Sequence, residues 1–451
     1  MAWQMLHGWQ RRESGTIEVN SPRPMPDIDL LPCFIPEAPL DMEALGIPWA
    51  LVVDLTARRL DLDGVASLDS LRTKLKLPNA VIEAVFRHFQ AEKLVEIKGS
   101  DGNELNLSLT AAGHKFANDR IQVCHYAGPA PVSLGDYQTA VRAQSARPQI
   151  NRKHLQQVFS DLVIENEILD QLGPALISQK SLFLFGPSGN GKTSVAERLV
   201  NIYDDTVVIP LAVEVDGQII CVYDPVVHKP VELGYFEMDP RWIVCQRPAV
   251  IVGGELTAEM LELRLDPVTN TYAAPVQMKA SNGILVLDDF GRQTISPTTI
   301  LNRWILPLDR RVDYLNLSYG LKFQVPFELM IVFSTNLEPR ALLDPAFLRR
   351  LPNKIMIRSV SEQNFMEIFR RVAERCGFTY DPQIADRLLE SCRTLGGGKL
   401  RACYPRDICE IAVCINAYEE SPSELSLAIL ERALQIYFAD SAAGTAEDAL
   451  D

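Results

Sequence analysis

The chain alternates short apolar runs, which have the length of buried strands, with longer stretches that repeat apolar residues at helical spacing. The strand-like runs between residues 181 and 360 are SLFLF, TVVIPLAVEV, AVIVGGEL, GILVLDD, LMIVFSTN and NKIMIRS. Strands that alternate with helices predict a parallel sheet covered by helices. We therefore expect an α/β core over residues 155–360, whose first strand follows the helical stretch HLQQVFSDLVIENEILDQLG.

Beyond residue 360 the strand pattern stops and helical spacing continues to residue 438. A break at Gly396, Gly397 and Gly398 divides this region. The pattern predicts a helical domain over residues 361–440. Residues 441–451 are mostly small or acidic, which is typical of a loose tail.

The N-terminal region has two parts with different patterns. Residues 1–46 contain six prolines and little apolar periodicity, which predicts an extended or disordered arm that could dock on a neighbour. Residues 47–125 read as helix, turn, helix and a hairpin closed at Asp101, Gly102 and Asn103, the order of a winged helix. A linker that contains proline and glycine, residues 126–154, joins this α+β domain to the core.

Composition restricts the compartment and the partners. The formal net charge of -14 argues against a general coating of nucleic acid or anionic membrane and favours protein partners. No apolar run is long enough for a membrane span, and no secretory leader is recognisable. The nine cysteines contain no CxxC pair and no metal-ligand spacing with histidine, so we expect reduced thiols in a cytoplasmic protein.

A glycine-rich loop follows the strand SLFLF and precedes a helical pattern. The loop fits the phosphate-binding motif GxxxxGK(S/T), in which backbone amides converge on a phosphate, the lysine reaches the β- and γ-phosphates and the hydroxyl ligates magnesium. We therefore expect ATP and Mg²⁺ as ligands. The predicted binding residues are Gly186, Pro187, Ser188, Gly189, Asn190, Gly191, Lys192, Thr193 and Ser194, with Thr193 as a metal ligand.

A phosphate site of this kind needs carboxylates at the end of a neighbouring strand. The run GILVLDDFGR supplies Asp288 and Asp289 directly after four apolar residues. We expect Asp288 to ligate magnesium and Asp289 to activate the attacking water.

With these motifs the chain resembles the AAA+ ATPases over residues 155–440. This resemblance implies a doubly wound parallel sheet with a C-terminal helical lid. The resemblance implies that Asn336, at the end of MIVFSTN, positions water. It also implies that Arg349 or Arg350 completes the site of the next subunit and that Arg406, in YPRDI, is a sensor in the lid. Where the family usually has Asp-Glu, this chain has Asp288-Asp289, which leaves open slow hydrolysis.

The interval between Thr193 and Asp288 exceeds the two βαβ units of about 30 residues each that a parallel sheet requires. We expect extra hairpins in LAVEVDGQIICVYD, turning at Asp216-Gly217, and in LRLDPVTNTYAAPV, with another in YLNLSYGLKFQV before the Asn336 strand. Such insertions resemble the AAA+ branch of MoxR-like and enhancer-binding ATPases, and a bacterial group called predicted ATPases with chaperone activity. The enhancer-binding GAFTGA loop is absent. Candidate pore contacts are Tyr235, Phe236 and Tyr319.

The winged-helix stretch offers little for DNA. Residues 47–120 contain ten basic and ten acidic residues, and only Arg87 and Lys93 lie near the outer face of the second helix. We expect this domain to dock protein or organise a ring.

The motifs predict catalytic roles for Lys192, Asp288 and Asp289, and the family resemblance adds Asn336, Arg349, Arg350 and Arg406 to this set. The implied protein is a homo-oligomeric ring, most simply a hexamer, that hydrolyses ATP to remodel a protein client. Two alternatives stay open: a DNA-acting ATPase recruited through the winged helix, and a nucleotide-gated scaffold with little turnover.

Overall fold

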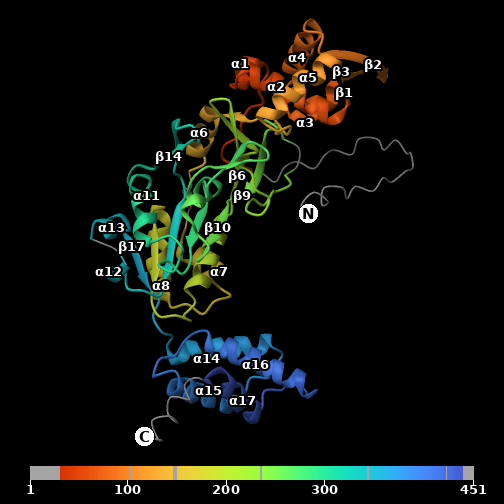
Figure 1. The fold of residues 1–451 in the computed structure, drawn as a ribbon. Coiled ribbons are helices and arrows are strands. Elements are labelled where there is room, and N and C mark those ends of the chain that lie inside the picture. Colours follow the sequence, from red (N-terminus) through yellow and green to blue (C-terminus); the bar gives the residue numbers. More distant parts are fainter. Residues whose placement is uncertain are drawn as a thin grey trace, which may run out of the picture.

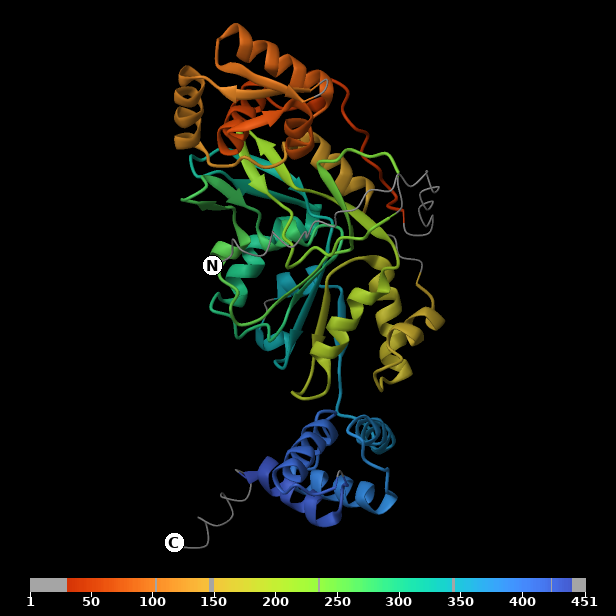
Figure 2. The same cartoon turned by 90° about the vertical axis from the view of Figure 1, so that its right-hand side faces the viewer.

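The computed structural model describes residues 31–101, 104–145, 150–233, 236–342, 345–422 and 424–439. The two perpendicular views place the N-terminal unit and the C-terminal helices at opposite ends of an elongated molecule (Figures 1 and 2). The sheets lie between them. Among the described residues, no helix is both long and apolar enough for a membrane crossing.

The N-terminal unit packs helices against a three-stranded antiparallel sheet, β1-β3-β2. Apolar residues of α2 and α4, including Leu55, Leu60, Val85 and Phe89, fill its core. The predicted β2–β3 hairpin is confirmed, with Asp101 opposite Glu104, while Gly102 and Asn103 lie outside the described residues. Its elements are α1 (Met42–Leu45), α2 (Trp49–Asp63), β1 (Val65–Ser67), α3 (Leu68–Leu75), α4 (Asn79–Ala91), β2 (Val95–Asp101), β3 (Glu104–Leu109) and α5 (Ala111–Val123).

The central sheet has five parallel strands in the order β10-β13-β16-β5-β17. Alternate residues of β5 enter different cores: Leu182 and Leu184 pack on one face and Phe183 on the other. Both faces are therefore buried, which explains the continuous apolar runs of these strands. The strands are β5 (Leu182–Phe185), β10 (Ala249–Val252), β13 (Ile284–Leu287), β16 (Met330–Thr335) and β17 (Asn353–Met356).

Helices cover both faces of this sheet, as the alternating pattern predicts. The helices of this part of the chain are α7 (Arg152–Val158), α8 (Asn166–Ser178), α9 (Lys192–Arg198), η2 (Leu199–Ile202), α11 (Pro297–Arg310), α12 (Pro339–Leu342) and α13 (Pro345–Arg350). The prediction of one continuous helical stretch before β5 is wrong. Two helices form instead, because α7 ends at Val158 and α8 begins at Asn166. The intervening residues line a cavity described below.

The surplus residues form a second β unit with its own core. A five-stranded sheet has the order β11-β12-β8-β7-β4, and β6 pairs with β9 in a separate ribbon. The three predicted hairpins, β7–β8, β11–β12 and β14–β15, are confirmed as antiparallel pairs. The elements are β4 (Val132–Ser133), β6 (Thr206–Pro210), β7 (Ala212–Val215), β8 (Gln218–Cys221), β9 (Trp242–Gln246), η3 (Ala258–Leu261), β11 (Arg264–Asp266), β12 (Thr271–Ala273), α10 (Val276–Lys279), β14 (Val312–Asn316) and β15 (Lys322–Pro326).

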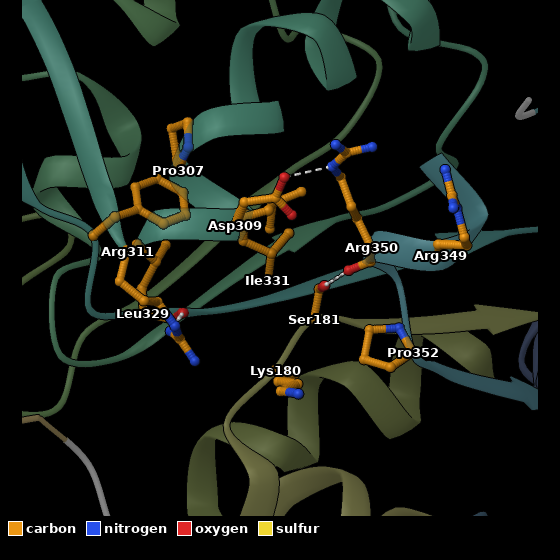
Figure 3. Close-up of a pocket in the computed structure, with 12 residues that line it drawn as sticks. Lys180, Ser181, Pro307, Asp309, Arg311, Leu329, Ile331, Arg349, Arg350 and Pro352 are labelled. Carbon is orange, nitrogen blue, oxygen red and sulfur yellow. Dashed lines mark hydrogen bonds and ion pairs between the residues drawn. The ribbon is translucent and has the colours of Figure 1, made fainter. Parts of the chain in front are cut away.

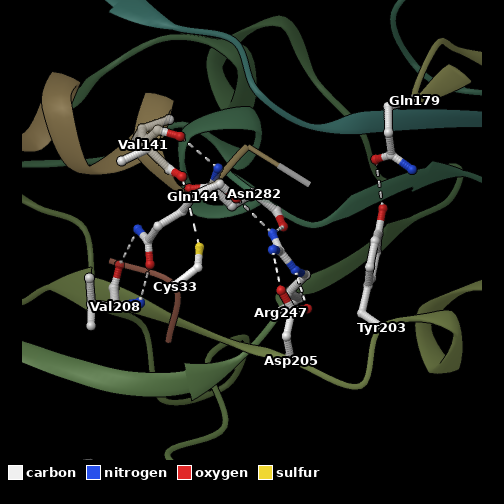
Figure 4. A network of polar contacts seen from close by, with 10 residues as sticks. Cys33, Val141, Gln144, Gln179, Tyr203, Asp205, Val208, Arg247 and Asn282 are labelled. Atoms are coloured by element: carbon white, nitrogen blue, oxygen red, sulfur yellow. Dashed lines mark hydrogen bonds and ion pairs between the residues drawn. The ribbon is translucent and has the colours of Figure 1, made fainter. Parts of the chain in front are cut away.

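The expected linker is an integral part of this second unit. Its strand β4 pairs with β7, and its helix α6 (Leu134–Ala143) ends at the buried amide of Gln144. That amide accepts from the Val208 N–H at 2.6 Å and donates to the Val208 carbonyl at 3.1 Å (Figure 4). Arg247, paired with Asp205, donates to the Gln144 and Asn282 carbonyls.

The segment before α1 also docks within its own chain. The Asp239 N–H donates to the Pro36 carbonyl at 2.9 Å, and Phe34 packs against the core of the second β unit. Residues 1–30 of the expected arm lie outside the described residues, as does the expected acidic tail, residues 441–451.

The C-terminal region is a bundle of α14 (Glu362–Arg375), α15 (Pro382–Leu395), α16 (Tyr404–Tyr418) and α17 (Leu427–Tyr437). Side chains such as Phe365, Leu388, Ile408 and Leu430 form its core. The predicted break at the three glycines lies between α15 and α16, and Cys403, in the segment that follows it, contacts Gly189 in the loop after β5.

Candidate nucleotide-binding site

A cavity of about 510 Å³ lies at the carboxyl ends of β5, β13 and β16, the edge of a parallel sheet where ligands bind. The predicted loop forms one wall, because Ser188, Gly189, Asn190, Gly191, Lys192, Thr193 and Ser194 all line the cavity. Asp288, Asp289, Asn336 and Arg406 line it too. The fold thus brings together residues that lie far apart in the sequence.

Glycine is required where the loop leaves β5. Gly186 has φ 142°, and a Cβ there would lie 2.1 Å from the Ile357 carbonyl oxygen. Gly189 has φ 79°, and its Cβ would lie 2.7 Å from the Cys403 sulfur. Any larger residue would collide with neighbouring groups, so the loop keeps a backbone surface that can approach a phosphate.

Lys192 begins α9 and turns back over the loop. Its ammonium donates to the Gly186 carbonyl at 2.9 Å and to the Pro187 carbonyl at 3.0 Å. Burial lowers the pKa of Lys192, while the carboxylates of Asp289 and Asp288 oppose that shift. A single buried cation held beside the loop backbone suits a polyphosphate ligand.

Thr193 and Asp288 meet across the sheet edge. The Thr193 hydroxyl donates to the Asp288 carboxylate at 2.9 Å. A hydroxyl and a carboxylate oxygen are ligands that Mg²⁺ prefers in nucleotide sites. Their proximity fits the expected magnesium site, with Thr193 and Asp288 as the protein ligands.

The segment after Asp288 is held in a fixed conformation. Asp289 adopts a left-handed φ of 47°, and the next N–H, of Phe290, donates to the Ser334 carbonyl of β16 at 2.7 Å. The Gln293 amide donates to the Asp288 carbonyl at 2.7 Å and accepts from the Gly291 N–H at 2.8 Å. Gln293 therefore braces the acidic turn, a role that its sequence position did not indicate.

The C-terminal bundle closes one side of the cavity. The Cys403 N–H donates to the Gly189 carbonyl at 2.9 Å, and Arg371 of α14 donates to the Ser160 carbonyl at 2.9 Å. Arg406 lines the cavity, is 61% exposed and pairs with Asp407 at 3.0 Å. The Cys403 contact attaches the bundle to the glycine loop, and the Arg371 contact attaches it to the segment between α7 and α8.

An apolar wall completes the site and was missed from the sequence. Leu162, Val163 and Ile164, between α7 and α8, line the cavity together with Ile368 and Val372 of α14. An apolar wall beside a phosphate loop is suited to a nucleobase. The LVI run stands between acidic residues and could have signalled a break, but its spacing also fits a helix.

Arg349 and Arg350 lie elsewhere. They line a second cavity, of about 410 Å³, with Lys180, Arg311 and Asp309 (Figure 3). That cavity adjoins the first residues of β5, β16 and β17, so it occupies the sheet edge opposite to the loop. Within one copy, these two arginines therefore do not belong to the nucleotide cavity.

The predicted pore contacts have separate positions. Tyr319, at the tip of β14–β15, is 55% exposed and donates its hydroxyl to Asp216 at the tip of β7–β8, at 2.6 Å. Phe236 is partly buried against the core of the second β unit. Tyr235 lies outside the described residues.

A family model described as a domain of unknown function, DUF8689, matches residues 361–436, which are the bundle. No curated protein matches the sequence. Solved structures similar to the chain include RuvB of Thermotoga maritima, described as a Holliday junction branch migration motor, with 11% identity, a TM-score of 0.35 and coverage of 65% of this chain and 72% of that chain. NtrX of Brucella abortus has 12% identity, a TM-score of 0.37 and coverage of 70% of this chain and 60% of that chain. At these values the functional argument rests on the residues of the cavity.

Proposed function

We propose that the chain is a magnesium-dependent ATPase of the AAA+ class that works as a homo-oligomeric ring, most simply a hexamer. The observation that carries this proposal is the contact of the Thr193 hydroxyl with Asp288 beside a complete phosphate-binding loop, at the carboxyl edge of a parallel sheet. Backbone amides of the loop and the Lys192 ammonium bind the phosphates. The apolar wall of Leu162, Val163 and Ile164 receives the base.

Hydrolysis follows an in-line path. A water attacks the γ-phosphorus, its proton passes to Asp289, and the bond to the oxygen bridging the β- and γ-phosphates breaks to give ADP and inorganic phosphate. Asn336 orients the water, and Arg406 contacts the phosphates from the bundle. Bound magnesium, held by Thr193 and Asp288, would neutralise charge on the phosphate oxygens.

The remaining positive charge comes from a second copy. Arg350 is half-buried, and its Nε donates to Asp309 at 2.7 Å, whereas Arg349 is exposed. We assign Arg349 as the group that reaches the triphosphate of the next copy and Arg350 as a residue that holds the α13 end in place. An arginine supplied in trans makes hydrolysis dependent on assembly.

The client is a protein in this account. The tips of β7–β8 and β14–β15 are in contact through the Tyr319–Asp216 hydrogen bond, and the proposal is that nucleotide-driven motion displaces the two hairpins together. Stimulation of hydrolysis by unfolded protein, but not by DNA, supports this client. If DNA stimulates hydrolysis, with a steep dependence on salt concentration, the client is DNA and the DNA-acting alternative is correct.

Magnesium-dependent turnover of ATP by the purified chain, compared with Asp288→Ala, tests the central proposal. We expect the wild-type protein to release phosphate and the variant to lose at least about 100-fold in rate, since it loses the metal ligand. Equal and negligible turnover by both proteins, with ATP still bound, would instead favour the nucleotide-gated scaffold, which the short Asp289 side chain makes chemically reasonable.

A further inference from the structure

The cavity around Arg349 is strongly cationic. Four basic side chains line it, against one carboxylate, in a chain whose formal net charge is -14. Buried apolar side chains, Phe327, Leu329 and Ile331, form its floor. Such a site suits an acidic side chain flanked by apolar residues.

Two of the four cations already have partners. Arg350 pairs with Asp309 (Figure 3). Arg311 donates to the Leu329 carbonyl at 3.3 Å and also to the Gln179 carbonyl. Lys180 and Arg349, which also line the cavity, are both exposed. In the described ranges of the chain, no carboxylate pairs with the Lys180 ammonium. Lys180 therefore has its charge available for another molecule.

A complementary segment borders the nucleotide cavity. Residues 161–170, DLVIENEILD, contain four acidic residues and no basic one. Asp161 pairs with Arg198, the last residue of α9, and Asp170 pairs with Arg152, the first residue of α7. Glu165 and Glu167 form no ion pair with any residue that the structure describes, and Glu167 is exposed in the first turn of α8.

We propose that the cationic cavity of one copy receives Glu167, with Glu165 beside it, from the next copy of the chain. The inference rests on the proposed function: Arg349 must reach the nucleotide cavity of the next copy, and residues 161–164 line that cavity. Because Lys180 and Arg349 share one cavity, the acidic segment is brought to Lys180. The pair selects the correct face and register of assembly.

Charge reversal with complementation tests the pair. Lys180→Glu and Glu167→Lys should each weaken ATP-dependent self-association, measured by sedimentation velocity, by about tenfold or more, because like charges then face each other. Mixing the two variants should restore association to within about threefold of wild type, since each copy then offers an opposite charge to its neighbour. Lys229→Glu, the same charge change on an exposed loop outside both surfaces, should have little effect.

The outcomes separate this inference from the proposed function. If the wild-type chain assembles with ATP but both reversals leave association unchanged, or if mixing restores nothing, the Lys180–Glu167 pair is wrong and the ATPase ring stands. If the wild-type chain binds ATP and stays monomeric, the ring itself is wrong and the pair falls with it. Unchanged ATP binding by both variants shows that each is folded.

Discussion

The two cavities of the central sheet lie at opposite edges of the same five strands and differ in how they are built. The nucleotide cavity draws its phosphate wall from eight consecutive residues, Ser188 to Val195, and the glycine geometry at Gly186 and Gly189 shapes this loop. The cationic cavity gathers single side chains from the starts of strands and the ends of α11 and α13. The first has its loop and carboxylates together within one copy, whereas in the second no carboxylate of the described residues pairs with Lys180 or Arg349. In the proposed ring, the two edges would meet across a subunit boundary.

Removing the trans arginine should have the largest effect. We expect Arg349→Ala to lower the rate of hydrolysis by about 1,000-fold, because an arginine supplied to transition-state phosphate charge contributes at least this much. Binding of ATP should be unchanged, since Arg349 lies outside the nucleotide cavity of its own copy. Steady-state phosphate release and calorimetry measure the two quantities.

Arg350→Ala is the matched control for that experiment. It removes the same charge one residue away, but Arg350 is engaged with Asp309, so its loss should act mainly on stability. Equal rate losses from both variants would contradict the assignment of Arg349.

The next largest effect is expected from replacing the lysine of the nucleotide edge, with the lysine of the cationic edge as its comparison. Lys192→Ala should weaken ATP binding by about 100-fold, because it removes charge-assisted hydrogen bonds to phosphate worth about 3 kcal/mol together. Lys180→Ala should leave the ATP dissociation constant of the monomer unchanged, since Lys180 lies at the other edge. Titration calorimetry, at a protein concentration too low for the copies to assemble, compares the ATP dissociation constants of the two variants directly.

The smallest effect is expected from lengthening the proposed base. Asp289→Glu should raise the rate of hydrolysis by up to about tenfold, because the longer carboxylate reaches further toward the attacking water. The left-handed φ of 47° at this position is better tolerated by aspartate than by glutamate, which limits the gain. A fall in rate at unchanged melting temperature would show that Asp289 already has the correct reach.

The nucleotide edge of the sheet was predictable because short, continuous stretches of sequence specify its residues. A strand, a glycine loop and Lys192 form one continuous signal, and Asp288 and Asn336 end apolar runs that a parallel sheet brings to the same edge. Local turn residues also predicted the three hairpins of the second β unit. These elements are specified within a few residues each.

The cationic edge could not be predicted in the same way. Lys180 and Arg311 are single residues of ordinary surface type, and only the meeting of strand starts with helix ends makes them neighbours. The LVI wall was also missed, since apolar residues at 162–164 satisfy helical spacing even though the tertiary fold uses them to line the cavity. The linker was underestimated because β4 has two residues, and its pairing with β7 is a long-range contact.

Mixing two inactive variants tests most directly whether each active site is shared between copies. Lys192→Ala lacks its own phosphate lysine but keeps Arg349, whereas Arg349→Ala has an intact loop and lacks the arginine for its neighbour. In an equal mixture, about a quarter of the interfaces in a ring combine an intact loop with an intact arginine, so we predict that phosphate release returns to about a quarter of the wild-type rate. A mixture that stays as inactive as its components, although the two variants co-assemble, would contradict the account.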